Sequence, residues 1–422
     1  MKVSARTIAV EVLARVARDG AYAAAALDAE LDRHPGLDPR ERALAAELTY
    51  GTLRAEGALL RAVEKHAPRG ISDDAVRRHL LVAAYQLLLL DRVPAWAAVD
   101  EAVGNLKAMR GPRVAGFANA VLRKVGTDTL ELATAIRDSA PAWLVAALTE
   151  AVGADEADGL LGIGVPLGRV WARAVGGADA PAWIGDAEPH GTVAGAFAAP
   201  GGDPEKLEGY ETGAFAIQEP GAQLVALSLG ALPGERVLDA CAGRGQKTTL
   251  IAERLAEHGE VWATDSHPNK LKALAREAER LHLVPPRMAA VDHTLGAGDL
   301  PDGFDRVLVD APCTGVGTLR RRPEIAGRLK PEDSKRLGAL AAAILRGAAA
   351  RAKDGGRVVF AVCSVLSEEA EQVIETVSDL LEPTPFDAPE VIALFGAGTS
   401  SFRLLPKRHG TDGYFVASLR KR

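Results

Sequence analysis

The stretch RVLDACAGRGQKTTLIAERL, residues 236–255, decides the fold that the sequence predicts. An apolar run leads into a glycine-rich loop, and a helical pattern follows directly. Apolar runs without polar alternation are typical of strands in a parallel sheet that helices cover on both faces. Four more such runs follow, separated by helical patterns: VWATDS (261–266), RMAAVD (287–292), RVLVDA (306–311) and RVVFAVCS (357–364). We therefore predict a doubly wound α/β domain, closed by the late strands SFRLLPK (401–407) and GYFVASLR (413–420).

The glycine-rich loop fits two common nucleotide sites poorly. A dinucleotide fingerprint needs a third glycine where this chain has Thr248, and no Gly-Lys-Ser/Thr of a phosphate loop is present. Asp265 ends the second predicted strand, where a carboxylate is well placed to accept hydrogen bonds from a ribose diol. The pattern favours a nucleoside cofactor without a pyrophosphate, and S-adenosylmethionine is the commonest such ligand.

The chain has three cysteines, and each falls at the end of a predicted strand. Cys241 ends the first, Cys313 follows the fourth and Cys363 ends the fifth. In the usual doubly wound order these strands are neighbours, about 4.8 Å apart from each to the next, so the thiols would line one crevice. A lone free cysteine is commonly a core residue, but three at adjacent strand ends are harder to explain by packing. No Cys-x-x-Cys or histidine pair has zinc-ligand spacing, and a regulatory disulfide is not expected in a reducing cytoplasm.

Residues upstream of the α/β domain divide into two further predicted domains. Residues 1–130 show apolar residues at helical spacing, with breaks expected at Gly51, 68–70, Pro94 and 111–112, and predict an all-helical bundle. Residues 131–214 begin with one more helix (141–153) and then become rich in Gly, Ala, Pro and Asp, which predicts a small, weakly packed α+β linker domain. The α/β domain would occupy residues 215–422.

Charge is unevenly distributed along the chain. The net charge is −6, yet residues 1–127 carry +4 and residues 128–209 carry −9. Basic clusters such as Arg320–Arg322 could meet phosphates, although a solvated surface is as good an explanation for any one cluster. The longest apolar run, LLVAAYQLLLL (80–90), is too short to span a bilayer, and the N-terminus does not have the pattern of a secretory signal. We therefore expect a cytoplasmic protein without a membrane segment.

Four segments together resemble the Nop/Sun family of RNA cytosine-C5 methyltransferases: DACAGRGQKT, VDAPCTGVGTLRRRPEI, FAVCSVLSEEAEQVI and DGYFVASLRKR. The N-terminal part of the chain is similar to the NusB-like RNA-binding domain of the bacterial 16S ribosomal RNA branch of that family. Three segments carry this similarity: LDPRERALAAELTYGTLR, AYQLLLLDRVPAWAAVDEAV and GFANAVLRKV. The resemblance implies a class I, Rossmann-like methyltransferase domain, S-adenosylmethionine as cofactor and 16S ribosomal RNA as substrate. We further expect a monomer that binds no metal.

The resemblance also implies roles for individual residues. Cys363 would be the nucleophile, Cys313 would assist release of the methylated base, Asp310 would bind the cytosine edge and Lys247 would face the active site. Arg320, Arg321 and Arg322 would contact RNA phosphates. The implied cofactor site, in which Asp265 would bind the ribose and Asp292 would lie near the adenine, consists of Cys241, Ala242, Gly243, Arg244, Gly245, Gln246, Lys247, Asp265, Asp292 and Asp310. Simpler explanations are a solvated, helix-opening Lys247 and an Asp292 that caps a turn.

The chain departs from the family pattern at several positions. Gly243, Arg244 and Gln246 replace the Ala, Pro and Gly of Cys-Ala-Ala-Pro-Gly-Gly-Lys, and Val362 and Ser367 replace a threonine and a proline beside Cys363. The usual Arg-Val-Asn stretch is not visible, and VWARA (170–174) is the candidate for its place. Transfer RNA is an alternative substrate. A non-catalytic RNA-binding assembly factor, which the altered glycine loop would suit, and a Rossmann-type dehydrogenase are alternatives of another class.

Overall fold

The computed structural model describes residues 3–422 except 92, 177–179 and 297. Residues 177–179 fall in the predicted linker domain and lie outside the described residues. The chain divides into two compact units. We call Met1–Ala147, Leu161–Gly164 and Leu319–Leu329 the helical unit, and Leu148–Leu160, Val165–Thr318 and Lys330–Arg422 the α/β unit. The predicted division into three domains stays a prediction.

The helical unit confirms the predicted all-helical front end. Its helices are α1 (Ala5–Asp19), α2 (Ala23–Asp32), α3 (Pro39–Arg54), α4 (Glu56–Lys65), α5 (Asp74–Leu89), α6 (Ala95–Arg110), α7 (Pro112–Val125) and α8 (Leu132–Ser139). Apolar residues from most of them share one core, with Leu48, Leu80 and Leu122 fully buried. The expected break at Gly51 is wrong, because Gly51 is buried inside α3. A Cβ there would lie 2.0 Å from the Tyr85 ring of α5, so the glycine permits close helix packing instead of a turn.

The predicted linker region contains a small antiparallel sheet. After α9 (Ala142–Val152) and α10 (Ala154–Leu161) come β1 (Trp171–Ala174), α11 (Ala182–Gly185), β2 (Ala196–Ala198), a 3₁₀ turn (Pro204–Lys206) and β3 (Phe215–Ile217). The strand order is β2-β1-β3. Its buried core is small: only Ala172, Phe197 and Phe215 are buried among the described residues of this cluster, and their apolar neighbours are partly buried. Such a small core agrees with the predicted weak packing.

The α/β unit is built on an eight-stranded mixed sheet. The strands are β4 (Arg236–Asp239), β5 (Glu260–Asp265), β6 (Arg287–Ala290), β7 (Phe304–Asp310), β8 (Ala352–Val362), β9 (Leu381–Pro383), β10 (Ser401–Leu404) and β11 (Tyr414–Lys421). The order is β10-β11-β8-β7-β4-β5-β6, and β9 pairs with β11. The five predicted strands β4 to β8 are parallel, whereas β9 to β11 pair antiparallel. The predicted neighbours are confirmed, since β7 lies between β4 and β8.

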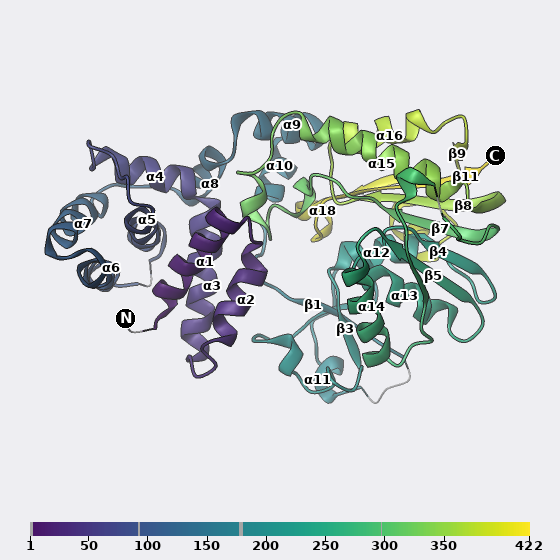
Figure 1. The fold of residues 1–422 in the computed structure, drawn as a ribbon, viewed down its shortest axis with the longest axis horizontal. Helices are drawn as coiled ribbons and strands as arrows, with labels where there is room; N and C mark the ends of the chain where they lie inside the picture. Colours follow the sequence, from purple (N-terminus) through teal and green to yellow (C-terminus); the bar gives the residue numbers. More distant parts are fainter. Residues whose placement is uncertain (1–2, 92, 177–179, 297) are drawn as a thin grey trace. The chain divides into compact units, whose positions relative to one another are not determined.

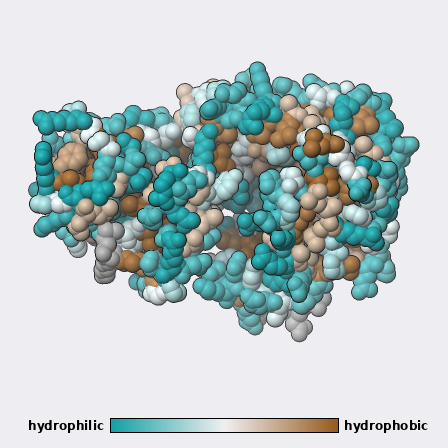
Figure 2. All heavy atoms as spheres, in the orientation of Figure 1, coloured by the Kyte–Doolittle hydropathy of each residue, from teal (hydrophilic) through white to brown (hydrophobic). Residues whose placement is uncertain are grey.

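Helices cover both faces of this sheet (Figure 1). One face packs against α12 (Pro220–Ser228), α13 (Gln246–Leu255) and α17 (Pro389–Phe395), and the other against α15 (Asp333–Ala349) and α16 (Glu371–Thr376). α14 (Pro268–Arg280) packs against β5 and β6, and α18 (Pro406–His409) precedes β11. On the face seen in Figure 2, hydrophilic residues predominate and hydrophobic ones form small groups. Among the described helices, none has the length and apolarity needed to cross a membrane.

Candidate active site

Two thiols meet at the carboxyl ends of β7 and β8. Cys363 directly follows β8, and Cys313 lies three residues beyond the end of β7. Because β7 and β8 are adjacent, their loops converge, and the Sγ atoms of Cys313 and Cys363 are 3.4 Å apart. Both side chains are partly exposed, as is Cys241, which follows β4. The predicted convergence of the thiols is confirmed for Cys313 and Cys363, whereas a place for Cys241 in the same crevice stays a prediction. No cluster of metal-ligating side chains occurs in the part of the chain that the structure describes.

Lys247 and Asp310 form an ion pair beside the thiols. Lys247 lies in the first turn of α13, and its Nζ is 2.6 Å from Oδ2 of Asp310, the last residue of β7. The side chains are 13% and 26% exposed, so Lys247 is not the freely solvated lysine of the simpler explanation. Burial acts to lower the pKa of Lys247, but the charges of Asp310 and Cys363 outweigh it and raise that pKa above its ordinary value. The lysine therefore stays charged.

The glycine-rich loop is fixed by its backbone. Gly245 adopts φ +91° at the start of α13, and a Cβ on it would lie 1.9 Å from Leu274 Cδ1, so only glycine fits. The amide of Gly243 donates to Asp265 Oδ2 over 3.2 Å. A Cβ on Gly243 would have no atom closer than the Cys241 carbonyl oxygen at 4.0 Å, so this part of the loop faces open space. The side chains of Arg244 and Gln246 are exposed.

Asp239 lies buried at the end of β4 and was not singled out from the sequence. Its Oδ2 accepts a hydrogen bond from the Thr248 hydroxyl over 2.7 Å, while Oδ1 has no partner among the described residues. Burial raises the pKa of Asp239 to about 6. The only signal for Asp239 in the sequence is its position, because it is the last polar residue of an apolar strand before the glycine-rich loop.

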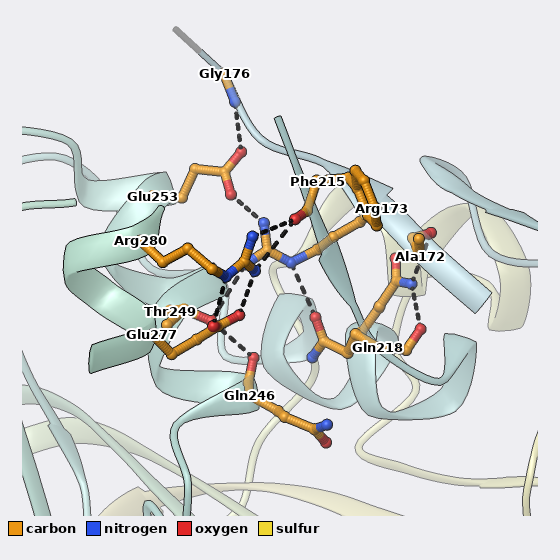
Figure 3. A network of polar contacts seen from close by, with 11 residues as sticks. Ala172, Arg173, Gly176, Phe215, Gln218, Gln246, Thr249, Glu253, Glu277 and Arg280 are labelled. Carbon is orange, nitrogen blue, oxygen red and sulfur yellow. Dashed lines mark hydrogen bonds and ion pairs between the residues drawn. The ribbon is translucent and has the colours of Figure 1, made fainter. Parts of the chain in front are cut away.

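A polar network joins the linker sheet to the helices behind the glycine loop (Figure 3). Arg173 of β1 is 3% exposed, ion-pairs with Glu253 of α13 and donates to the Thr249 hydroxyl over 3.2 Å. That hydroxyl donates to the backbone oxygen of Gln246, the first residue of α13. VWARA (170–174) thus contributes a buried cation that fixes the helix following the loop.

Arg280 of α14 makes the second link in this network. Its guanidinium donates to the carbonyl oxygen of Phe215 in β3 over 3.3 Å and pairs with Glu277 at 2.6 Å. The linker sheet therefore contacts both α13 and α14, which flank the glycine loop and the end of β5. The sequence did not reveal this role, because the partners of Arg173 and Arg280 are remote in the chain.

Tyr414 and Glu369 complete the surroundings of the thiols, and sequence reasoning missed both. Phe415 pairs with Val362 across β11 and β8, so the next position places Tyr414 opposite Cys363. Its ring is 5% exposed, with the Lys247 Nζ 5.9 Å from its centre. Burial, and then the nearby carboxylates, raise the pKa of the Tyr414 phenol. Glu369 is fully buried and hydrogen-bonds to Thr314, the residue after Cys313.

Asp292 occupies a turn rather than a strand end. Its Oδ1 accepts the backbone N–H of Thr294 over 2.9 Å and the Thr294 hydroxyl over 2.7 Å, which caps the 3₁₀ turn His293–Leu295. These bonds lower the pKa of Asp292, and its side chain is exposed. The geometry fits the simpler explanation of a turn cap. A contact to adenine stays a prediction.

The three arginines after the Cys313 loop lie in the helical unit. The Arg320 side chain is 6% exposed, and its carbonyl oxygen accepts a hydrogen bond from Arg54 over 2.9 Å. Arg321 and Arg322 are exposed, and the guanidinium of Arg322 lies 5.4 Å from the centre of the Tyr22 ring. Because Arg320 is buried, little of its side chain is accessible to an RNA phosphate. We therefore restrict the predicted phosphate contact to Arg321 and Arg322.

Comparisons with known proteins find relatives of both the N-terminal and the C-terminal parts of the chain. A family model described as 16S rRNA methyltransferase RsmB/F matches residues 226–420, and the NusB family model matches residues 3–127. Ribosomal RNA small subunit methyltransferase B of Thermus thermophilus is 34% identical, covering 99% of this chain and 97% of that protein. The corresponding protein of Pseudomonas putida is 31% identical, covering 99% and 98%.

Two solved structures share the fold. The crystal structure of PH0851 covers 99% of both chains at a TM-score of 0.82 and 21% identity. NSun6 from Pyrococcus horikoshii covers 67% of this chain and 98% of its own at a TM-score of 0.57 and 17% identity. At these identities the likeness concerns the fold alone.

Proposed function

Because the chain belongs to the Nop/Sun family, in the branch of small-subunit ribosomal RNA methyltransferases that contains a NusB domain, we propose that it methylates carbon 5 of a cytosine in 16S ribosomal RNA. Methylation of RNA follows from the family, whereas the base, the atom and the covalent route are the content of the proposal. The observation that supports it most is the pair of thiols 3.4 Å apart, beside Lys247 and Asp310.

Carbon 5 of cytosine is a poor nucleophile, and covalent catalysis overcomes this. The Cys363 thiolate would add to carbon 6, forming an S–C6 bond and moving the ring's π electrons to carbon 5. When bound, S-adenosylmethionine would supply the methyl group to the nucleophilic carbon 5, and its sulfur would become a neutral thioether. A base removes the proton from carbon 5, and the S–C6 electrons return to sulfur as the methylated base departs.

The surroundings of the two thiols support different roles for them. The hydrogen bond to Cys363, together with burial, raises the pKa of Cys313 well above its ordinary value. Cys313 therefore stays protonated at neutral pH and can donate its S–H to Cys363 Sγ, which stabilises a thiolate there. The ammonium of Lys247 adds positive charge close to that thiolate. Asp310, held by Lys247, can accept a hydrogen bond from the amino group of the cytosine edge.

The residues at the strand ends fit S-adenosylmethionine, which would supply the methyl group. Asp265, at the end of β5, can bind a ribose diol, and its carboxylate is already oriented by the Gly243 amide. The open space beside Gly243 leaves room for a ligand to approach the loop backbone. The replacements Gly243, Arg244 and Gln246 therefore do not obstruct the loop. The alternative of a non-catalytic assembly factor is therefore not needed to explain these three replacements.

Substitution of each thiol tests the covalent route. We expect Cys363→Ala to abolish methyl transfer and to form no RNA–protein adduct, because the nucleophile is lost. Cys313→Ala should accumulate a covalent adduct, visible as a slow band on a denaturing gel, because release is impaired. Normal methylation by Cys363→Ala would refute the assigned nucleophile, and a Cys313→Ala enzyme without adduct would refute the release role.

The substrate is tested separately. Bisulfite sequencing of total RNA from a deletion strain should show one cytosine in 16S ribosomal RNA that has lost its methyl group. Loss at a transfer RNA position instead would favour the alternative substrate. Calorimetry with S-adenosylmethionine distinguishes the non-catalytic assembly factor, which would bind no cofactor.

A further inference from the structure

Glu369 is a fully buried carboxylate next to the active site. It ends the 3₁₀ turn Ser367–Glu369 and is 0% exposed. Its Oε1 accepts the backbone N–H of Thr314 over 2.6 Å, and its Oε2 accepts the Thr314 hydroxyl over 2.5 Å. Thr314 directly follows Cys313, so the carboxylate holds the loop that presents this thiol.

The same residue belongs to the loop that follows the other thiol. Glu369 lies on the segment after Cys363 and β8, where the N–H of Leu366 donates to the Oγ of buried Ser364 over 3.2 Å. A carboxylate of the Cys363 loop is therefore bonded to the residue directly after Cys313.

A carboxylate that is buried this deeply is stable in its charged form only when hydrogen-bond donors satisfy its oxygens. Burial raises the pKa of Glu369, and the two hydrogen bonds from Thr314 act in the opposite direction. Its negative charge in turn contributes to the raised pKa of Cys313. A backbone bond from Gly317 N–H to the Cys363 carbonyl oxygen, 3.0 Å long, also joins the loops, but it reaches neither Cys313 nor the residue beside it.

We propose that Glu369 is the positioning residue of the thiol pair, in that its carboxylate, which lies on the loop after Cys363, holds the residue after Cys313 and so sets the Sγ–Sγ distance. Glu369 itself touches neither the base nor the cofactor in this assignment. The importance of that distance for methyl transfer rests on the proposed function, but the distance itself can be measured without any activity.

The first test uses phenylarsine oxide, a probe of closely spaced dithiols. Two thiols displace the oxide oxygen as water and form two As–S bonds, so one arsenical per chain protects both cysteines from alkylation, as read by intact mass. We expect Glu369→Gln and Glu369→Ala in the full chain to weaken this binding about tenfold, the effect of removing one charge-assisted hydrogen bond. Glu368→Gln, one residue away and only half-buried, is the matched control and should bind like wild type.

A milder variant guards against misfolding. Thr314→Val keeps the size of the side chain and the backbone bond to Oε1 but removes the hydroxyl bond to Oε2. We expect it to weaken arsenical binding in the same direction but less than Glu369→Ala. Wild-type binding by both Glu369→Gln and Thr314→Val, with normal melting curves, would overturn the proposal.

The second test measures catalysis. Glu369→Gln should accumulate the covalent RNA adduct, as Cys313→Ala does, because Cys363 stays attached to β8 while the releasing thiol is displaced. KM for S-adenosylmethionine should stay unchanged while kcat falls, which a general loss of structure would not produce. If Cys313→Ala forms no adduct, the release role in the proposed function fails, and if Cys363→Ala methylates RNA normally, the covalent route fails; in either case the arsenical experiment still decides on Glu369.

Discussion

Asp239 shows how one buried side chain makes the segment before the glycine-rich loop sensitive to pH. Its carboxyl group is 1% exposed, and burial raises its pKa to about 6, against about 3.9 for an unperturbed aspartate. The folded chain therefore binds this proton more tightly than the unfolded chain does. Its contribution to stability is favourable at low pH and declines as the pH rises from about 4 to 6. Above pH 6 the carboxylate is charged in the folded and in the unfolded chain, so the whole cost of burying that charge lowers the free energy of unfolding.

Asp239→Asn should remove this dependence. The amide oxygen can still accept from Thr248, and the amide nitrogen replaces the unpaired Oδ1 without a charge. We expect the variant to gain about 2 kcal/mol in free energy of unfolding at pH 8 and about half of that at pH 5. Urea unfolding followed by tryptophan fluorescence measures the difference. The exposed Asp299→Asn is the control, and an equal gain for Asp239→Asn at both pH values would contradict the raised pKa.

The sequence located the thiols but not the residues that hold them. Cys313 and Cys363 each follow an apolar strand, and the usual strand order makes those strands neighbours, so their convergence could be predicted. Glu369 and Asp239 could not be assigned, because their roles depend on burial and on partners that only the folded chain brings close. Glu369 meets Thr314 across 55 residues of sequence, and no local pattern encodes that contact.

Among the elements, the crossing of α3 and α5 depends on one glycine. Gly51 should destabilise α3 relative to alanine by helix propensity alone, by about 1 kcal/mol. The contact with Tyr85 reverses this expectation, because a Cβ would overlap the ring. We expect Gly51→Ala to lower the free energy of unfolding of the helical unit by about 1–3 kcal/mol, in the range of overpacked cores. Thermal unfolding followed by far-UV circular dichroism provides the measurement.

Gly104 is the matched control for this prediction. It also lies inside a helix, α6, but a Cβ on it would have no atom within 4 Å among the described residues. Gly104→Ala should therefore stabilise the unit by up to about 1 kcal/mol. The two substitutions must have opposite signs. A stabilising Gly51→Ala would mean that Tyr85 moves away at little cost.

Helix starts can be recognised from the sequence where local signals act alone. α1 and α3 begin at residues whose preceding side chains, Ser4 and Asp38, cap the helix, a signal that a local pattern can carry. α2 lacks this signal, because its N-cap residue Tyr22 provides no side-chain cap. The first amide of α2, that of Ala23, instead donates to Glu324 Oε1, 301 residues away in the sequence. A cap supplied from so far cannot be recognised locally.

Over the whole molecule, a net charge of −6 has to be reconciled with an RNA substrate. The negative charge is concentrated in residues 128–209, which carry −9, while residues 1–127 carry +4. Segment 319–329 adds exposed arginines to the helical unit, so basic residues from two distant parts of the chain contribute to one compact unit. Contacts to phosphates give affinity without sequence preference and weaken steeply with salt.

Arg321 and Arg322 should therefore act on affinity rather than on chemistry. We expect Arg321→Gln with Arg322→Gln to weaken RNA binding and to reduce the slope of log affinity against log salt by about one for each phosphate that an arginine no longer neutralises. Fluorescence anisotropy over a potassium chloride series measures this slope, and the S-adenosylmethionine affinity should not change. Arg169→Gln is the control, since this exposed arginine belongs to the acidic stretch and pairs with Glu188 at 2.7 Å. An unchanged slope in the double variant would mean that the two arginines only pack against the helical unit, as Arg322 does against Tyr22, and that RNA binds to other basic residues.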